Sequence, residues 1–190
     1  MKKILLPLLL CAVLCGCGGA ETGNAVQEQY RTLETARLEA EVTSHTSTDS
    51  RTFTLLCSYD ADGDAVTTVT APGELAGLTA VVSGTDMTLR SEGLQLPAGA
   101  SLDICPANCL PYLLRALADG YVLEQSGEAL DDTPCLRLAL DTTAPGGGKV
   151  LCAVWLDAEG LFPRYAEFSR NEQVVLTVKL LAFTCTTSEG

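Results

Sequence analysis

Alternation of apolar and polar side chains runs through most of this chain, and it constrains the fold more than any other feature. In the first clear stretch, Leu38, Ala40 and Val42 alternate with charged neighbours such as Arg37 and Glu41. A period of two places successive side chains on opposite faces of a β-strand. Clusters of Asp, Gly and Pro separate one alternating run from the next, so we expect consecutive strands joined by short turns. The chain should therefore form mainly an antiparallel sheet.

Ten strands are expected from this pattern. The last of them, 174–185, is nearly all apolar, which predicts a central position in the sheet. The ninth follows Pro163 and ends near Arg170. The others are expected at 37–43, 52–59, 65–71, 78–83, 86–92, 121–127, 135–141 and 149–157.

Two segments have helical spacing instead. From about Asn24, the apolar residues Val26, Tyr30 and Leu33 lie at i, i+4 and i+7. A second, strongly apolar helix is predicted from the i, i+3, i+4 and i+7 positions Leu110, Leu113, Leu114 and Leu117. Gly120 fits the end of that helix. Such an apolar helix needs a partner surface, and the sheet is the large surface available, which gives an α+β fold class.

The N-terminus has the layout of a secretory signal segment, with two lysines, the apolar run Ile4–Leu14 and small residues before a cysteine. The apolar run is too short to span a bilayer. The stretch Leu14-Cys15-Gly16-Cys17 resembles the lipobox of bacterial lipoproteins. The resemblance implies that Cys17 is acylated and becomes the mature N-terminus; an ordinary cleaved signal or an uncleaved anchor is the alternative.

The organisation expected from these features is a signal peptide at 1–16, a lipidated cysteine with a flexible Gly-rich tether at 17–23, and one domain at 24–187. The domain would lie outside the cytoplasm in the cell envelope, anchored to the membrane by its acyl chains. Whether that membrane is inner or outer is left open.

Charge narrows the classes of partner. The formal net charge is −12, and removal of Lys2 and Lys3 with the signal peptide would take it to −14. Such a chain repels phosphate backbones and anionic headgroups. Nucleic acid is therefore not an expected partner, and membrane attachment must come from the acyl chains on Cys17.

Six cysteines follow Cys17, and in an exported protein they permit disulfides. Six cysteines allow 15 pairings, which spacing does not distinguish. They are Cys57, Cys105, Cys109, Cys135, Cys152 and Cys185. No metal site or other cofactor is expected, since His45 is the single histidine and no second Cys/His pair has ligand spacing.

Other motifs have structural explanations. The acidic stretch 60–64 is similar to a calcium loop, but its glycine falls too early and Ala71 stands where a bidentate glutamate is needed. The glycines at 146–148 precede a strand rather than a helix, unlike a phosphate-binding loop. His45 and the acidic pair Asp131-Asp132 lie in expected turns. No nucleophile motif or triad is visible, so we do not expect an enzyme.

The segment Val154-Trp155-Leu156-Asp157-Ala158-Glu159-Gly160-Leu161-Phe162-Pro163-Arg164 pairs a strand end, an acidic Gly turn and a proline strand start. Together with the later turn at Asn171-Glu172-Gln173, it resembles hairpins of the LolA/LolB/LppX-like lipoprotein superfamily, which includes germination lipoproteins of Gram-positive bacteria. The resemblance covers about 26–184. It implies a curved antiparallel sheet forming an incomplete (half) barrel, with two helices packed on its concave side.

The resemblance also implies that the concave apolar face holds acyl chains. By face, the expected lining residues are Val42, Phe53, Leu55, Leu89, Leu138, Trp155, Phe168 and Val178. For each of them the alternative is plain core, which is the more common role of an apolar strand residue. The expected function is a membrane-anchored domain that binds a lipid or other hydrophobic ligand. The alternative is a protein-interaction lipoprotein of the envelope with a filled core.

Overall fold

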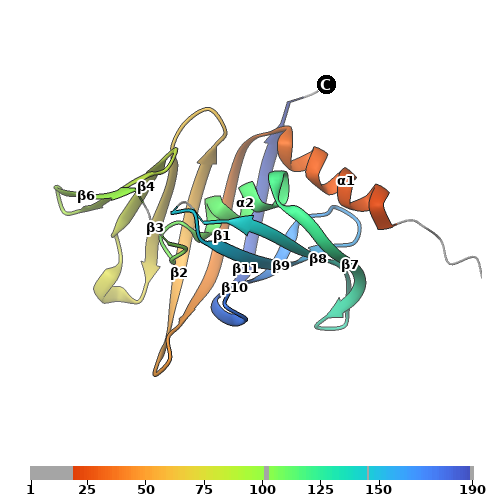
Figure 1. The fold of residues 1–190 in the computed structure, drawn as a ribbon. Helices are drawn as coiled ribbons and strands as arrows, with labels where there is room; N and C mark the ends of the chain where they lie inside the picture. The colour runs from red at the N-terminus through yellow and green to blue at the C-terminus, as the bar shows by residue number, and fades with distance from the viewer. Residues whose placement is uncertain (1–18, 101–102, 145, 189–190) are drawn as a thin grey trace, which may run out of the picture.

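The computed structural model describes residues 19–100, 103–144 and 146–188. Within them lie two α-helices and a large open antiparallel sheet of eleven strands (Figure 1). The helices are α1 (Gly19–Arg31) and α2 (Cys109–Asp119), with a short 3-10 helix η1 (Gly73–Leu75). The strands are β1 (Leu33–His45), β2 (Ser50–Asp60), β3 (Ala65–Ala71), β4 (Thr79–Ser83), β5 (Asp86–Ser91), β6 (Leu94–Ala100), β7 (Tyr121–Leu130), β8 (Thr133–Thr143), β9 (Lys149–Asp157), β10 (Pro163–Arg170) and β11 (Gln173–Thr187).

The sheet consists of two meanders, β1 to β6 and β7 to β11, and they are joined where the first strand of one, β1, pairs with the last strand of the other, β11. Its order is β6-β5-β4-β3-β2-β1-β11-β10-β9-β8-β7. Strand β11 pairs with β1 on one side and β10 on the other, which confirms the central position expected for the apolar run 174–185. Strands β6 and β7 are the two edges. Because α2 connects them in sequence, the chain has to travel from one edge of the sheet to the other through this helix.

Helix α2 lies against the sheet and forms the centre of the core. It contacts both β2 and β8, on opposite sides of the central strands. Leu110, Leu113 and Leu117 are completely buried, whereas Arg115 and Asp119 are exposed. We call the sheet face that packs on α2 the inner face. The i, i+3, i+4, i+7 pattern therefore predicted both the helix and its partner surface.

We expect Leu113→Ala to lower the free energy of unfolding by about 2–5 kcal/mol, since it opens a cavity where α2 meets the sheet. Leu94→Ala is the matched control, because Leu94 is 70% exposed and its loss leaves the core intact. Urea unfolding followed by circular dichroism measures both. Equal effects of the two substitutions would contradict the central role of α2.

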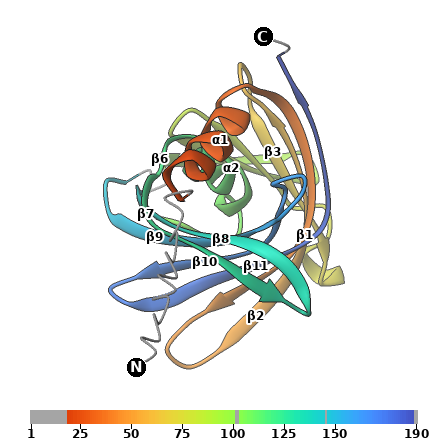
Figure 2. The same cartoon turned by 90° about the vertical axis from the view of Figure 1, so that its right-hand side faces the viewer.

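Helix α1 begins at Gly19, earlier than the start expected near Asn24, and packs beside α2 (Figure 2). Its buried side includes Val26 and Tyr30. The Tyr30 hydroxyl donates to the Leu161 carbonyl at 3.0 Å, and burial raises the pKa of this phenol. Leu33, expected on the helix, is the first residue of β1. Its i+7 spacing fits a helix, but its buried side chain serves the strand equally well.

The hairpin between β9 and β10 is held by Asp157. Its Oδ1 accepts hydrogen bonds from the backbone N–H groups of Gly160 at 2.8 Å and Glu159 at 3.0 Å. These two bonds lower the pKa of the Asp157 carboxyl, and Arg164, 3.8 Å away, lowers it further. The acidic Gly turn noted in the sequence is thus closed by its own aspartate.

A depressed carboxyl pKa stabilises the fold above the unfolded-state value and loses that contribution as pH falls through the folded-state value. Asp157→Asn should therefore lower stability near neutral pH. The difference from the wild-type protein should shrink in acid, below the usual carboxyl pKa of about 3.9. Unfolding midpoints measured from pH 7 to pH 3 test this. A difference that stays constant across the range would show that the charge has no role.

Strand β6, at one edge of the sheet, was not predicted from the sequence, because Pro97 and Gly99 interrupt its short alternation.

Cys17 and the signal segment lie outside the described residues. Neither α1 nor α2, nor any other helix in the described part of the chain, is long and apolar enough to cross a bilayer.

Candidate functional site: an apolar pocket beside helix α2

An apolar pocket of about 180 Å³ lies on the inner face, beside the start of α2. We call it the inner pocket. Strands β2 to β5 supply one wall, and the loop before α2 supplies the other. The lining residues are Phe53, Leu55, Thr67, Val69, Leu75, Leu78, Ala80, Leu89, Cys105, Pro106 and Ala107. None of these side chains is charged, so the pocket is suited to an uncharged, hydrophobic occupant.

The register of the strands determines which residues form the sheet wall of the pocket. Thr67 of β3 lies opposite Cys57 of β2 and Ala80 of β4, and Ala80 lies opposite Leu89 of β5. Directly paired residues on neighbouring strands project from the same face. The paired residues Cys57, Thr67, Ala80 and Leu89 therefore form one row across four strands on the same face. Small Ala80 in the middle of this row leaves the space that larger side chains surround.

The loop wall is held in place by Asn108, which is 2% exposed. Its Oδ1 accepts from the Cys105 backbone N–H at 2.9 Å, and its Nδ2 donates to the Asp103 carbonyl at 2.8 Å. The Asp103 carboxylate in turn pairs with Arg170 at the end of β10. These contacts fix the segment 105–107 over the sheet.

Asn108→Ala should loosen this wall, because it leaves the two backbone groups without their partner. A loss of about 1–3 kcal/mol of stability is expected. The same change should speed alkylation of Cys105, whose thiol pKa is raised by burial. Cys185 on β11 is also partly buried and serves as the internal control, with an unchanged rate. Mass spectrometry of alkylated peptides follows both thiols, and parallel acceleration of the two would indicate global rather than local loosening.

Three residues expected to line a ligand site, Phe53, Leu55 and Leu89, line the inner pocket. Four others are completely buried in the core packed around α2 and do not reach the pocket. They are Val42, Leu138, Phe168 and Val178.

Trp155, the eighth residue, lies on the opposite, outer face of the sheet. Its neighbours Val154 and Leu156 are the ones that point into the core. The indole Nε1 donates to Glu128 at 2.9 Å, and the Arg137 guanidinium lies 5.3 Å from the ring centroid. Trp155 therefore belongs to a polar and aromatic cluster of the outer face.

Sequence reasoning did not identify the rest of the lining. Thr67 and Val69 could have been predicted as lining residues, since their spacing of two places both on the same face of β3. The loop residues at 105–107 could not have been predicted from the sequence, because their position depends on where α2 docks.

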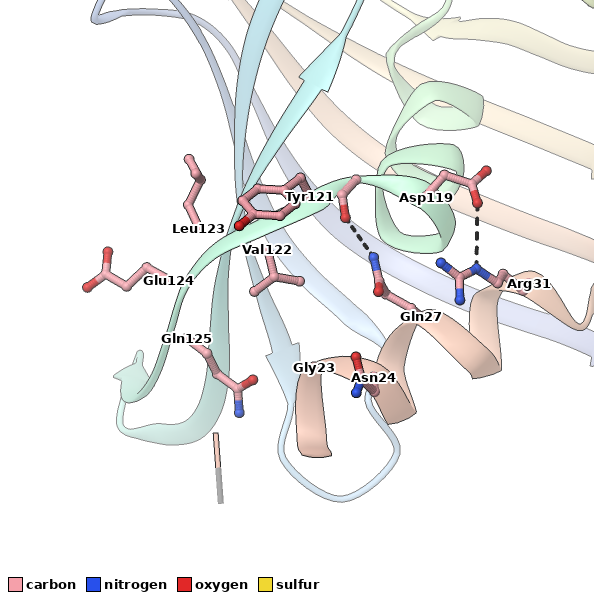
Figure 3. Close-up of a pocket in the computed structure, with 11 residues that line it drawn as sticks. Gly23, Asn24, Gln27, Arg31, Asp119, Tyr121, Val122, Leu123, Glu124 and Gln125 are labelled. Carbon is pink, nitrogen blue, oxygen red and sulfur yellow. Dashed lines mark hydrogen bonds and ion pairs between the residues drawn. The ribbon is translucent and has the colours of Figure 1, made fainter. Parts of the chain in front are cut away.

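A larger groove of about 630 Å³ lies between α1 and edge strand β7 (Figure 3). Gln27 donates to the Gly120 carbonyl at 2.6 Å, and Arg31 pairs with Asp119 at 3.6 Å. Amide and charged side chains line most of this groove. It is an open groove of mixed lining, in which Tyr121, Val122 and Leu123 supply apolar surface, so it is less suited than the inner pocket to a wholly hydrophobic ligand.

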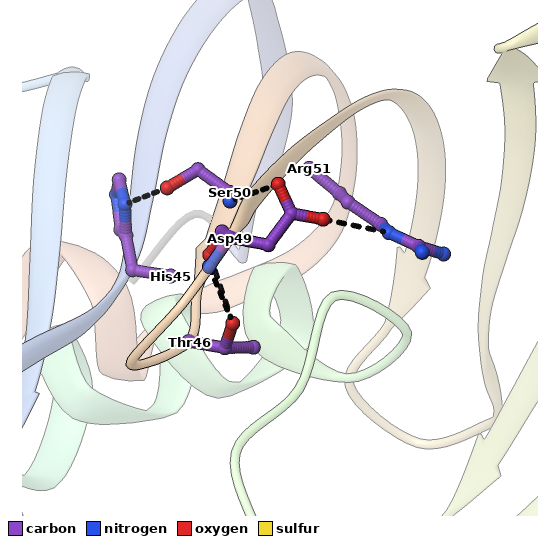
Figure 4. A network of polar contacts seen from close by, with 5 residues as sticks. All are labelled: His45, Thr46, Asp49, Ser50 and Arg51. Atoms are coloured by element: carbon purple, nitrogen blue, oxygen red, sulfur yellow. Dashed lines mark hydrogen bonds and ion pairs between the residues drawn. The ribbon is translucent and has the colours of Figure 1, made fainter.

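The chain's one histidine closes the turn between β1 and β2 (Figure 4). His45 Nδ1 lies 3.1 Å from Ser50 Oγ, and His45 Nε2 lies 3.3 Å from Thr177 Oγ1. The Asp49 carboxylate accepts from the Ser50 backbone N–H at 2.8 Å and lies 3.5 Å from Arg51 Nε. The carboxylate thus holds the turn rather than orienting the imidazole, as a catalytic triad would require.

Cys57, Cys105, Cys109, Cys135, Cys152 and Cys185 have free thiols in the structure. Burial raises the pKa of Cys57 to about 11, and it also raises the pKa values of Cys109 and Cys152. Buried thiols of this kind are poor nucleophiles near neutral pH. The described residues hold no group of three or more His, Cys, Asp or Glu side chains placed to bind a metal ion.

No protein-family model matches the chain, and no curated protein matches it. Solved structures do. An uncharacterised conserved protein from Thermus thermophilus is 11% identical, with 90% of this chain and 89% of that chain covered and a TM-score of 0.54. A DUF1329 family protein from Desulfovibrio piger is 12% identical, with 90% and 94% covered and a TM-score of 0.50. A LolA superfamily protein from Nitrosomonas europaea is 13% identical, with 90% and 95% covered and a TM-score of 0.49.

The first two structures show that this chain shares their overall fold, and a LolA superfamily structure is among the similar ones, in line with the family to which the hairpin motifs pointed. Identities of this size carry no information about ligand or partner.

Proposed function

We propose that this protein is a membrane-anchored extracytoplasmic lipoprotein that binds a lipid or another hydrophobic molecule in the inner pocket. In this proposal the sheet acts as a half-barrel, with its inner face as the concave side and both helices covering it. The acyl chains on Cys17 hold the domain at the membrane, and the protein has no enzymatic activity.

The apolar lining of the inner pocket is the observation that carries the proposal. The core of a protein usually fills such space with side chains, because an unfilled apolar cavity lowers the free energy of unfolding. Here, Leu89 and Phe53 are only partly buried on the pocket side of their strands. A hydrophobic ligand would complete their burial, and each methylene removed from water contributes about 0.8 kcal/mol.

Anchoring suits a receptor or acceptor better than a shuttle. A domain fixed by acyl chains stays at one membrane, so any hydrophobic ligand has to reach it there. The net charge of −12 argues against attraction to anionic headgroups. The ligand would therefore be recognised through its apolar part.

A protein-interaction role is the second candidate, and the edges of the sheet favour it. Leu94 and Leu96 on β6 are 70% and 65% exposed, and Tyr121 and Leu123 on β7 are also exposed. Edge strands carry unpaired backbone groups that pair readily with another chain. In this alternative, a partner protein of the cell envelope covers an edge and the core is already filled.

Native mass spectrometry of the full-length lipoprotein, released from bacterial membranes in mild detergent, separates the two roles. The proposal predicts an adduct of lipid size that disappears on denaturation. Leu89→Trp should abolish the adduct, because the indole fills the pocket. Leu96→Trp is the matched control: Leu96 lies directly opposite Leu89 on β6 but outside the pocket lining, so the adduct should remain.

A bare mass for the wild-type protein in repeated preparations would contradict ligand binding. Crosslinking to an envelope protein at β6 or β7 would then support the interaction role. Loss of the adduct in both tryptophan variants would place the ligand elsewhere on the protein.

A further inference from the structure

Two leucines of edge strand β6, Leu94 and Leu96, project from the inner face of the sheet. Leu96 pairs directly with Leu89, which lines the inner pocket, and Leu94 pairs with Ser91, two residues further along β5. Directly paired residues project from the same face, so both leucines share the face of Leu89. They are nevertheless 70% and 65% exposed. We call this pair the edge leucines.

The edge leucines extend the sheet wall of the inner pocket to the edge of the sheet. The row that contains Thr67, Ala80 and Leu89 continues into Leu96. Neighbouring strands lie about 4.8 Å apart, so Leu96 is about 10 Å from Ala80 in the middle of the row. An apolar molecule can therefore pass between the pocket and the edge along a single face.

Another protein strand is a poor match for this edge. Pro97 of β6 has no backbone N–H to donate, and the register between β5 and β6 shifts just beyond its pair with Thr88. Proline and local irregularity on an edge strand both oppose the addition of a further strand. A second copy of the chain is disfavoured as well, because each copy carries a net charge of −12.

The chemistry of β6 favours an apolar, uncharged partner. Its sequence, LQLPAGA, contains no charged residue, so it offers no ion pair to a partner surface. Its two large side chains are both leucine, which gains free energy on transfer from water into hydrocarbon.

We infer that the edge leucines contact the apolar part of a lipid bilayer, so that the inner face leads from the bilayer to the inner pocket. The inference rests on the proposed function and specifies where a hydrophobic ligand enters. Two partly exposed leucines give only a weak contact by themselves. The acyl chains proposed on Cys17 supply the second attachment that stable membrane binding needs.

Quenching of tryptophan fluorescence by brominated lipid tests this contact. The full-length acylated protein is reconstituted into phosphatidylcholine vesicles whose acyl chains carry bromine. Trp155, the chain's one tryptophan, is first replaced by Trp155→Phe. Leu96→Trp then reports on the edge of β6. Leu123→Trp on β7 and Leu181→Trp on β11 are matched controls, since these leucines are 51% and 48% exposed.

We expect quenching at Leu96→Trp to be roughly 3-fold stronger than at either control, because a side chain in contact with the bilayer lies at the level of the acyl chains. Replacing part of the phosphatidylcholine by phosphatidylglycerol should weaken the quenching, since anionic headgroups repel the acidic domain. Circular dichroism confirms that each variant is folded.

Equal quenching at the three positions, or none at Leu96→Trp, would overturn the membrane contact. Stronger quenching with phosphatidylglycerol would overturn its apolar basis. A photo-crosslinking residue at position 96 that captures a protein in cells, and no lipid, would assign the edge to a protein partner instead. If the contact fails but the lipid-sized adduct persists in native mass spectra, the proposed binding function stands; loss of both would overturn that function too.

Discussion

Burial of helix α2 against the inner face of the sheet is the interaction on which the rest of the structure depends. The helix is the chain's passage between the two edge strands, β6 and β7, so it has to cross the sheet. Its apolar side chains meet strands from both meanders. Besides this contact, the pairing of β1 with β11 joins the strands of the two meanders. Helix α1 is secondary in this sense, because it packs chiefly on α2.

The same packing determines where a ligand has room. Helix α2 begins at Cys109, and among the strands β2 to β5 that line the pocket it packs mainly on β2. The loop held by Asn108 covers part of this region, and the small side chain of Ala80 leaves space beneath it. Around β8 to β10, by contrast, Leu138 and Phe168 are completely buried and leave no such opening. The pocket is thus a consequence of where the crossing helix starts.

Much of this architecture was predictable from local patterns. Period-two alternation identified ten of the eleven strands, and the four leucines at 110–117 identified the helix and its need for a sheet. The face assigned to Trp155 was wrong, although its period-two partner, the polar residue Asp157, indicated the outer face. Strand β6 was not predictable, because Pro97 and Gly99 interrupt its short alternation. The loop wall at 105–107 was not predictable either, because its position depends on where α2 docks.

The central claim is that the inner pocket holds a hydrophobic molecule rather than protein side chains. The most direct measurement is a crystal structure of the full-length protein, purified from bacterial cells together with any molecule that it retains. The account predicts continuous ligand density between Leu55, Val69 and Leu89. A well-ordered pocket closed by the protein's own Phe53 and Leu75 side chains, with no ligand, would contradict it.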